Sequence, residues 1–110
     1  MRRITFALAL LFISTAALAQ TWKLRTATFY GPGLYGNRTA CGRRLEPGTV
    51  GVAHRSLPCG TPVTFYRHGH FVTVPVIDRG PFQRGVSWDL TAAAARSIGL
   101  AQSARMRSLH

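Results

Sequence analysis

Glycine and proline divide this chain into short segments. The chain contains 11 glycines and 6 prolines, and turn signals such as Gly80-Pro81 separate runs of β-branched and aromatic residues. One helix is predicted from Thr91, as its N-cap, to Ile98, with Gly99 as the stop. Strands are predicted at 25–30, 49–54, 61–66, 71–77, 86–90 and 106–109. Many short strands and one helix indicate a mainly β fold, a small β-barrel.

Two places in this pattern carry more specific expectations. His68-Gly69-His70 has the character of a hairpin turn between the third and fourth strands. Pro75 interrupts the fourth strand, which predicts a sheet edge or a bulge there, because proline donates no ladder hydrogen bond.

The first 19 residues have the layout of a secretory signal peptide. Met1-Arg2-Arg3 is basic, residues 4–17 are mostly apolar, and Ala17-Leu18-Ala19 supplies the small residues read at a cleavage site. We expect cleavage before Gln20, which leaves residues 20–110 as one domain. The alternative, a membrane anchor, is less favoured because the apolar run is shorter than the roughly 20 residues that span a bilayer.

Export sets the expected location. No cysteine lies near residue 20, so we expect no lipid anchor and no membrane insertion after cleavage. The sequence predicts a periplasmic or extracellular monomer associated with the cell wall.

The two cysteines, Cys41 and Cys59, both lie in the exported part. An even number of cysteines in an exported chain predicts a disulfide. Closing a loop of about 18 residues would stabilise the domain by roughly 3 kcal/mol in the chain-entropy model. A zinc site is not expected, because no histidines cluster with the two cysteines. We predict no metal and no other cofactor.

Positive charge is in large excess, with 14 Lys and Arg against 3 Asp and Glu. Such a surface attracts polyanions. For an exported protein the nearest polyanion is the cell envelope, with its peptide carboxylates, teichoic acids and lipid phosphates, rather than nucleic acid. A basic secreted protein without a specific anionic partner is the alternative.

The three carboxylates limit what acid/base chemistry is available. Asp78 follows an apolar run and opens a Gly-Pro turn, where partial desolvation would suit a general acid. The alternative is an Asx-type turn in which Asp78 bonds only its own backbone. Asp89 is assigned a structural role near the helix N-terminus, and Glu46 is expected in a solvated turn.

One histidine and several aromatic residues are candidate substrate contacts. His54 ends an apolar strand and could orient a substrate hydroxyl or carboxylate, although a core histidine is the alternative. Aromatic faces often grip sugar polymers, and four lie at turns or strand ends where they could equally pack in a core: Tyr30, Tyr35, Phe82 and Trp88.

Several motifs, in this order, resemble the double-psi β-barrel domain of the rare lipoprotein A (RlpA) family, over about residues 25–107. They are ATFYGPG at 27–33, GNRTA at 36–40, VAHRSLPCGT at 52–61, VIDRGPF at 76–82 and WDLT at 88–91. The resemblance implies a six-stranded double-psi barrel. It also implies a peptidoglycan lytic transglycosylase, whose partner is the peptidoglycan glycan strand.

The resemblance also implies roles for particular residues. Asp78 matches the catalytic Asp of the family's Asp-Arg-Gly-Pro motif, and His54 matches the active-site His of its Ala-His motif. We take Tyr30, Tyr35, Arg79 and Trp88 as the candidate substrate-binding residues. Enzymes of this family cleave between N-acetylmuramic acid and N-acetylglucosamine without water. One acid protonates the bridging oxygen, and the muramyl 6-hydroxyl then closes on the anomeric carbon to give a 1,6-anhydro end.

This mechanism suits a chain with few carboxylates, because one group can act as acid and then as base. A hydrolase normally needs two carboxylates, and the sequence offers Asp78 no obvious second partner. Many family members carry an acidic residue where this chain has Arg43 and Arg44. That difference supports an alternative, a non-catalytic expansin-like wall binder. A basic defence or inhibitor protein of barwin type is a third possibility.

Overall fold

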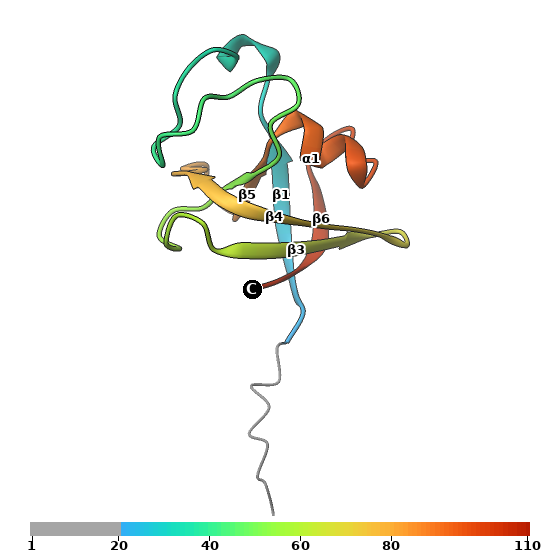
Figure 1. The fold of residues 1–110 in the computed structure, drawn as a ribbon. Helices are drawn as coiled ribbons and strands as arrows, with labels where there is room; N and C mark the ends of the chain where they lie inside the picture. Colours follow the sequence, from blue (N-terminus) through green and yellow to red (C-terminus); the bar gives the residue numbers. More distant parts are fainter. Residues whose placement is uncertain (1–20) are drawn as a thin grey trace, which may run out of the picture.

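Six strands close on themselves in the computed structural model, which describes residues 21–110 (Figure 1). Their order around the barrel is β1-β5-β2-β4-β3-β6, and β6 pairs with β1 to close it. The pairs β1–β5 and β2–β4 are parallel, and the others are antiparallel. The strands are β1 Lys23–Phe29, β2 Val52–Ala53, β3 Pro62–Arg67, β4 His70–Asp78, β5 Trp88–Leu90 and β6 Ala104–Leu109.

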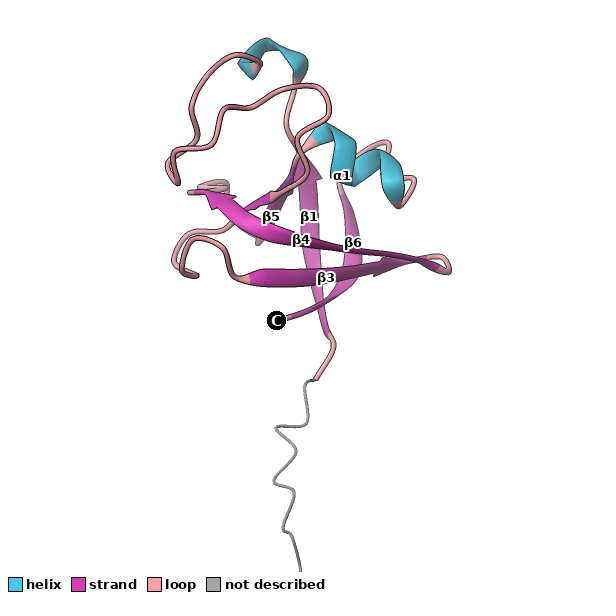
Figure 2. Ribbon diagram, in the orientation of Figure 1, coloured by secondary structure: helices cyan, strands magenta, loops and turns pink. Residues whose placement is uncertain are grey.

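One α-helix and one 3-10 turn complete the fold (Figure 2). The helix α1 spans Ala92–Ser97, and Thr91 caps it by accepting a hydrogen bond from the Ala94 N–H, as predicted. The 3-10 turn η1 spans Pro32–Leu34. The predicted mainly β six-stranded barrel is therefore confirmed. Among residues 21–110, no helix has the length and apolar character needed to cross a membrane. The predicted signal peptide lies outside the described residues.

The strand predicted at 49–54 is much shorter in the structure. Only Val52–Ala53 pair with neighbouring strands. The Thr49 hydroxyl instead donates to the Arg44 carbonyl and accepts from the Glu46 N–H, and Gly51 exchanges hydrogen bonds with the helix cap Thr91. These local bonds take up the backbone that a longer strand would have used.

Pro75 lies inside β4, opposite Pro62 of β3. The barrel is closed, so the proline does not mark a sheet edge. On the side of β4 that faces β2, pairing begins only at Val76, and a register irregularity follows between Val76 and Asp78. The missing N–H of Pro75 therefore costs no ladder hydrogen bond to β2, and the predicted bulge lies directly after it.

The barrel interior is one apolar cluster. Trp88 is part of it, and its indole N–H donates to the Ser108 hydroxyl at 3.1 Å, so the buried polar atom is satisfied. The larger side chains of the cluster are Val52, Val63, Phe65, Val74, Val76, Trp88, Leu90, Ile98, Leu100 and Met106.

A second, small cluster lies outside the barrel, beneath residues 31–48. It contains Tyr30, Leu45 and Ala53, with Tyr35 packed against them. The chain from 31 to 48, which we call the covering loop, arches over the end of the barrel in Figure 1. The packing of Leu45 on Ala53 anchors this loop to strand β2.

The predicted disulfide is confirmed and fixes the covering loop. Cys41 and Cys59 are joined at 2.04 Å, with Cα atoms 5.8 Å apart. The Cys41 N–H also donates to the Ile77 carbonyl at 3.1 Å. The loop is thus attached both to the end of β4 and to the 54–61 segment.

Removing the disulfide should weaken both the fold and this attachment. The double variant Cys41→Ser with Cys59→Ser should lose roughly 3 kcal/mol of unfolding free energy, because the unfolded chain regains the entropy of an open loop. Urea unfolding of the parent and the variant measures this loss. Hydrogen exchange at the Cys41 amide should accelerate more than exchange at Phe65. Equal exchange rates at residue 41 in the parent and the variant would contradict the conclusion that the disulfide attaches the covering loop to the barrel.

Candidate functional site

The register irregularity at the end of β4 determines where Asp78 points. Val52 pairs with Val76, but the next residue, Ala53, pairs with Asp78, so β4 carries one extra residue. Val76 points into the barrel core, whereas Ala53 belongs to the outer cluster. Because directly paired residues share a face of the sheet, the extra residue turns Asp78 outward, beneath the covering loop. Bulges commonly re-aim side chains in this way.

Three donors hold the Asp78 carboxylate in place. The Tyr30 hydroxyl donates to Oδ2 at 3.0 Å. The backbone N–H groups of Ala40 and Arg79 donate to Oδ1 at 2.8 and 2.9 Å. The bond from Arg79 is local, as the turn interpretation expected, but the other two come from distant parts of the chain. Asp78 is therefore more than a turn residue, because it connects β1, β4 and the covering loop.

An open hollow gives access to this carboxylate. Its volume is about 180 Å³. The residues around it are Tyr30, Leu34, Asn37, Arg38, Thr39, Leu45 and Asp78. The hollow lies between the covering loop and the end of β4, so a ligand entering it would meet the carboxylate and the Tyr30 phenol together.

Asp89 is the functional candidate that the sequence analysis missed. Ala53 pairs with Asp78 on one side and with Asp89 on the other, so the two carboxyl groups flank one alanine on one face of the sheet. The first turn of α1 contains no acidic residue, and Asp89 lies in β5, separated from Asp78 of β4 by strand β2. The alternation of Trp88 and Leu90, both inward, with Asp89 was the available signal. The parallel pairing that brings β2 beside β4 was not readable from the sequence.

The environment of Asp89 favours its protonated form. Burial raises the pKa of Asp89 from 3.8 to about 7, and the charge of Asp78 contributes to the same shift. Its Oδ1 atom is buried without a hydrogen-bond partner among the described residues. Burial, and then Asp78, also raise the pKa of Tyr30 above its ordinary 10.0, so this phenol stays a proton donor. The site therefore combines the Asp78 carboxyl group with the Asp89 carboxyl group, whose protonated form is favoured by burial.

His54 is held in one tautomer. Its Nδ1 accepts hydrogen bonds from the backbone N–H groups of Ser56 and Leu57, at 3.1 and 3.0 Å. The proton of the neutral ring is therefore on Nε2. Burial lowers the pKa of His54 below its ordinary 6.5, and the nearby His110, Arg55 and Arg79 lower it further. The ring is consequently a neutral hydrogen-bond donor at Nε2.

The histidine ring rests on Trp88, with ring centroids 4.7 Å apart. Trp88 is only 2% exposed, so it supports the His54 ring from the core side rather than forming a groove wall. The His54 backbone N–H donates to the Asp78 carbonyl at 3.2 Å, but no hydrogen bond joins the two side chains. The site residues thus form two neighbouring groups. In one, His54 packs on Trp88, and in the other, Asp78 is bonded to Tyr30, against which Tyr35 packs.

Two arginines brace the loops that carry these groups. Arg79 follows β4, and its guanidinium donates to the Leu57 carbonyl at 2.7 Å and to the His54 carbonyl at 3.4 Å. Arg55 follows β2, and its guanidinium donates to the carbonyls of Pro81 and Val86, both at 2.7 Å. Each arginine reaches the loop that follows the other strand, so the two loops are held in one arrangement.

The described residues include no group of three or more His, Cys, Asp or Glu side chains that could hold a metal ion. The titratable side chains that the structure gathers at this place are the Asp78 and Asp89 carboxyl groups, the Tyr30 phenol and the His54 imidazole.

Comparisons with known proteins bear on the family and the fold. The family model described as "Lytic transglycolase" matches residues 26–107. A probable endolytic peptidoglycan transglycosylase RlpA of Synechocystis sp. is 47% identical over 90 residues, which make up 80% of this chain and 28% of that protein. The endolytic peptidoglycan transglycosylase RlpA of Campylobacter jejuni is 38% identical over 79 residues, 70% of this chain and 29% of that protein. The chain thus spans less than a third of the length of these two relatives.

Among solved structures, the Streptomyces papain inhibitor has a similar fold. The TM-score is 0.62 at 23% identity, over 81% of this chain and 92% of that one. This likeness concerns the fold alone, and it agrees with the predicted double-psi barrel class.

The raised pKa of Asp89 has a consequence for stability. Because the folded pKa lies above the unfolded value of 3.8, the folded state binds more protons between these limits, and this group's contribution falls as pH rises from about 4 to about 7. Asp89→Asn should remove this pH-dependent decrease in the free energy of unfolding. Urea unfolding at pH 5 and pH 8 checks it, with Glu46→Gln as the matched control. An identical pH dependence in the parent and Asp89→Asn would show that Asp89 titrates normally.

The tautomer of His54 is directly observable. Nitrogen-15 NMR of the ring should show the proton on Nε2 at pH 7, and protonation should occur only below pH 6.5, because Nδ1 must first lose two backbone donors. A titration midpoint at or above pH 6.5 would contradict this assignment.

Proposed function

Because this chain belongs to the lytic transglycolase family, we propose that it cleaves peptidoglycan glycan strands between N-acetylmuramic acid and N-acetylglucosamine, leaving 1,6-anhydro ends. The proposal depends mainly on one observation. An accessible carboxyl group, Asp78, shares one face of the barrel with a second, Asp89, across Ala53, and burial raises the pKa of Asp89 to about 7. Such a substrate places the protein's work outside the cytoplasm, at the cell wall.

The pair supports a division of labour that one carboxylate alone would not allow. In our scheme Asp89 gives its proton to the bridging glycosidic oxygen as the bond from that oxygen to the anomeric carbon breaks. The muramyl 6-hydroxyl oxygen then bonds to the anomeric carbon, and its proton passes to Asp78. No water is consumed, and the pair ends with the one proton it began with. Transfer of that proton from Asp78 to Asp89 restores the starting state.

The neighbouring residues have positioning roles in this scheme. Tyr30 and the Ala40 N–H orient Asp78 through their hydrogen bonds. His54, as a neutral donor at Nε2, would hold a substrate hydroxyl or carbonyl rather than transfer a proton. Tyr35, which packs against the Tyr30 cluster, would contact the sugar chain. We assign Trp88 an indirect role, because it carries the His54 ring.

Arg79 also acts mainly through the protein in this proposal. Its guanidinium is engaged by the carbonyls of His54 and Leu57, and it lies 3.6 Å from the Cys59 sulfur. It therefore holds the histidine loop in position, and any direct contact with substrate would use the donors that remain.

A non-catalytic wall-binding protein is the second candidate. The observation that favours it is the absence of a carboxylate after the Thr39-Ala40 turn. Arg44 lies there instead and donates to the Gly36 carbonyl at 2.8 Å, so it stabilises the covering loop and offers no acid. Product release from purified peptidoglycan separates the two candidates.

Substitution of the carboxyl pair tests the catalytic proposal. Asp78→Asn should slow release of 1,6-anhydro products by about 10²–10⁴-fold, the usual size for loss of a proton-transfer group. Asp89→Asn should slow release to a similar extent, and the parent's rate should fall as pH rises above about 7, because the donor is then ionised. Chromatography of the soluble products from purified sacculi measures each rate at equal concentrations of folded protein.

Glu46→Gln is the matched control, because Glu46 is exposed and distant from the pair in the chain. If Asp89→Asn alone keeps the parental rate, Asp78 performs both proton transfers. If the parent binds sacculi and releases nothing, the wall-binding alternative replaces the catalytic proposal.

A further inference from the structure

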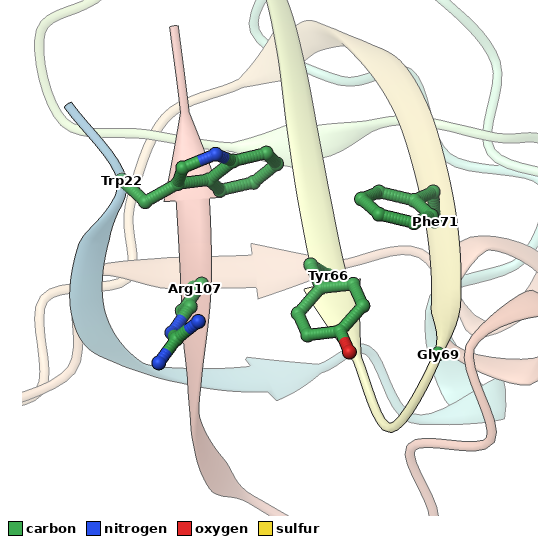
Figure 3. A pocket seen from close by; sticks show the side chains of 5 residues that line it. All are labelled: Trp22, Tyr66, Gly69, Phe71 and Arg107. Atoms are coloured by element: carbon green, nitrogen blue, oxygen red, sulfur yellow. The ribbon is translucent and has the colours of Figure 1, made fainter. Parts of the chain in front are cut away.

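An aromatic hollow lies on the outer face of the barrel, toward the other end of β4 from Asp78. The rings of Trp22, Tyr66 and Phe71 surround it, with Gly69 at the hairpin turn and Arg107 on β6 (Figure 3). Its volume is about 340 Å³. Ring centroids are 4.7 Å apart for Tyr66 and Phe71, and 6.2 Å apart for Trp22 and Phe71. The three rings therefore form one connected surface.

The strand register extends this surface across four strands. Phe71 pairs with Tyr66, Tyr66 with Arg107, and Arg107 with Leu24. Directly paired residues share a face, so these side chains form a row over β4, β3, β6 and β1. Neighbouring strands lie about 4.8 Å apart, so the row is about 14 Å long. Phe65 and Met106, which precede Tyr66 and Arg107 in the sequence, point inward to the core.

This row is unusually exposed for apolar side chains. Phe71 is 62% exposed, Leu24 47% and Trp22 39%. Contiguous exposed apolar groups on a soluble domain mark a surface that meets a partner. The three rings are tilted by 44° to 64° to one another, and an exposed aromatic face suits the C–H face of a pyranose ring.

Positive charge surrounds the same row. Arg105 and Arg107 of β6 and Arg67 at the end of β3 lie beside it, and strands β1, β3 and β6 contain no Asp or Glu. A second hollow, of about 160 Å³, adjoins the first and shares Tyr66 and Arg107 with it. It is lined by Arg67 and Arg105 as well. A ligand for the two hollows therefore needs both apolar ring faces and negative charges.

We propose that this row is a second binding surface for peptidoglycan, separate from the site at Asp78. Sugar rings of the glycan strand would stack on Trp22 and Phe71. Carboxylates of the stem peptides would bind Arg107 and its neighbouring cations through charge-assisted hydrogen bonds. The choice of peptidoglycan rests on the proposed function, because one polymer can offer sugar faces and carboxylates at regular intervals.

The distance between the two sites agrees with a polymeric ligand. Phe71 and Asp78 are seven residues apart on one strand, which corresponds to about 23 Å. A long strand could occupy both sites, whereas a short fragment would reach only one. Binding at the row would then raise the local concentration of glycan at Asp78.

Binding to sacculi tests this surface without relying on catalysis. All variants are made in an Asp78→Asn background, so the sacculi are not degraded, and bound protein is measured by cosedimentation. Trp22→Ala with Phe71→Ala should weaken binding by about tenfold or more, as expected for loss of aromatic contact residues. Phe71→Tyr should bind as the Asp78→Asn parent does, because it keeps a flat ring, whereas Phe71→Leu should not.

The charged part of the surface has its own test. Arg107→Gln should weaken binding to intact sacculi but not to glycan strands from which an amidase has removed the peptides. Val50→Ala and Arg84→Gln are matched controls, because both residues are exposed and lie outside the row. With Asp78 intact, the row variants should cleave short soluble fragments at the parental rate and sacculi more slowly. Parental cleavage of fragments also shows that these variants fold.

Three results would overturn the proposal. The first is that row variants bind sacculi as tightly as the controls do. The second is that the same substitutions abolish binding to vesicles of anionic lipid and leave binding to sacculi unchanged, which would identify a lipid surface. The third is that Phe71→Ala converts a dimeric parent into a monomer, which would identify contact between copies of the chain. If the parent releases no anhydro products but the row variants still lose sacculus binding, the catalytic proposal fails and the binding surface stands.

Discussion

The site depends on the pairing of the two-residue strand β2 with its two neighbouring strands. Val52 and Ala53 pair with β4 on one side and with β5 on the other, and both residues are almost completely buried. This double pairing brings Asp78 and Asp89 to opposite sides of Ala53. The same strand leads directly into His54 and the brace formed by Arg55. So short a strand can hold this position because the Thr91 cap and the outer cluster fix the chain on either side of it.

Much of the fold was readable from local patterns. The hairpin at Gly69, the Thr91 cap and the disulfide each follow from residues that are close in sequence or from simple cysteine counting, and the structure confirms them. Asp78 was identified from the family motif and from its place after an apolar run. Its relation to Asp89 was not, because that relation depends on one extra residue in β4 and on a parallel pairing between distant segments. The burial of Trp88 was predictable in principle, since Trp88 and Leu90 alternate with Asp89.

The carboxyl pair illustrates how a candidate site departs from the rules that stabilise a fold. The buried Asp89 Oδ1, which has no hydrogen-bond partner within residues 21–110, and the nearby charge of Asp78 both oppose folding. The domain tolerates Asp89 because the surrounding barrel is closed by hydrogen bonds on all six strands and the covering loop is covalently attached. Violations of this kind are expected where a site needs a reactive group in a fixed place.

The way Asp78 is held has a consequence for how the protein responds to its surroundings. Its partners are a phenol and two backbone amides, which are uncharged groups within a pocket formed by the covering loop. Dissolved ions screen attraction between exposed charges far more than they weaken short bonds of this type. A rise in salt concentration would therefore weaken any attachment made through the exposed arginines, while the geometry of the carboxylate stays intact. The cationic surface and the Asp78 carboxyl group thus differ in their sensitivity to the surrounding solution.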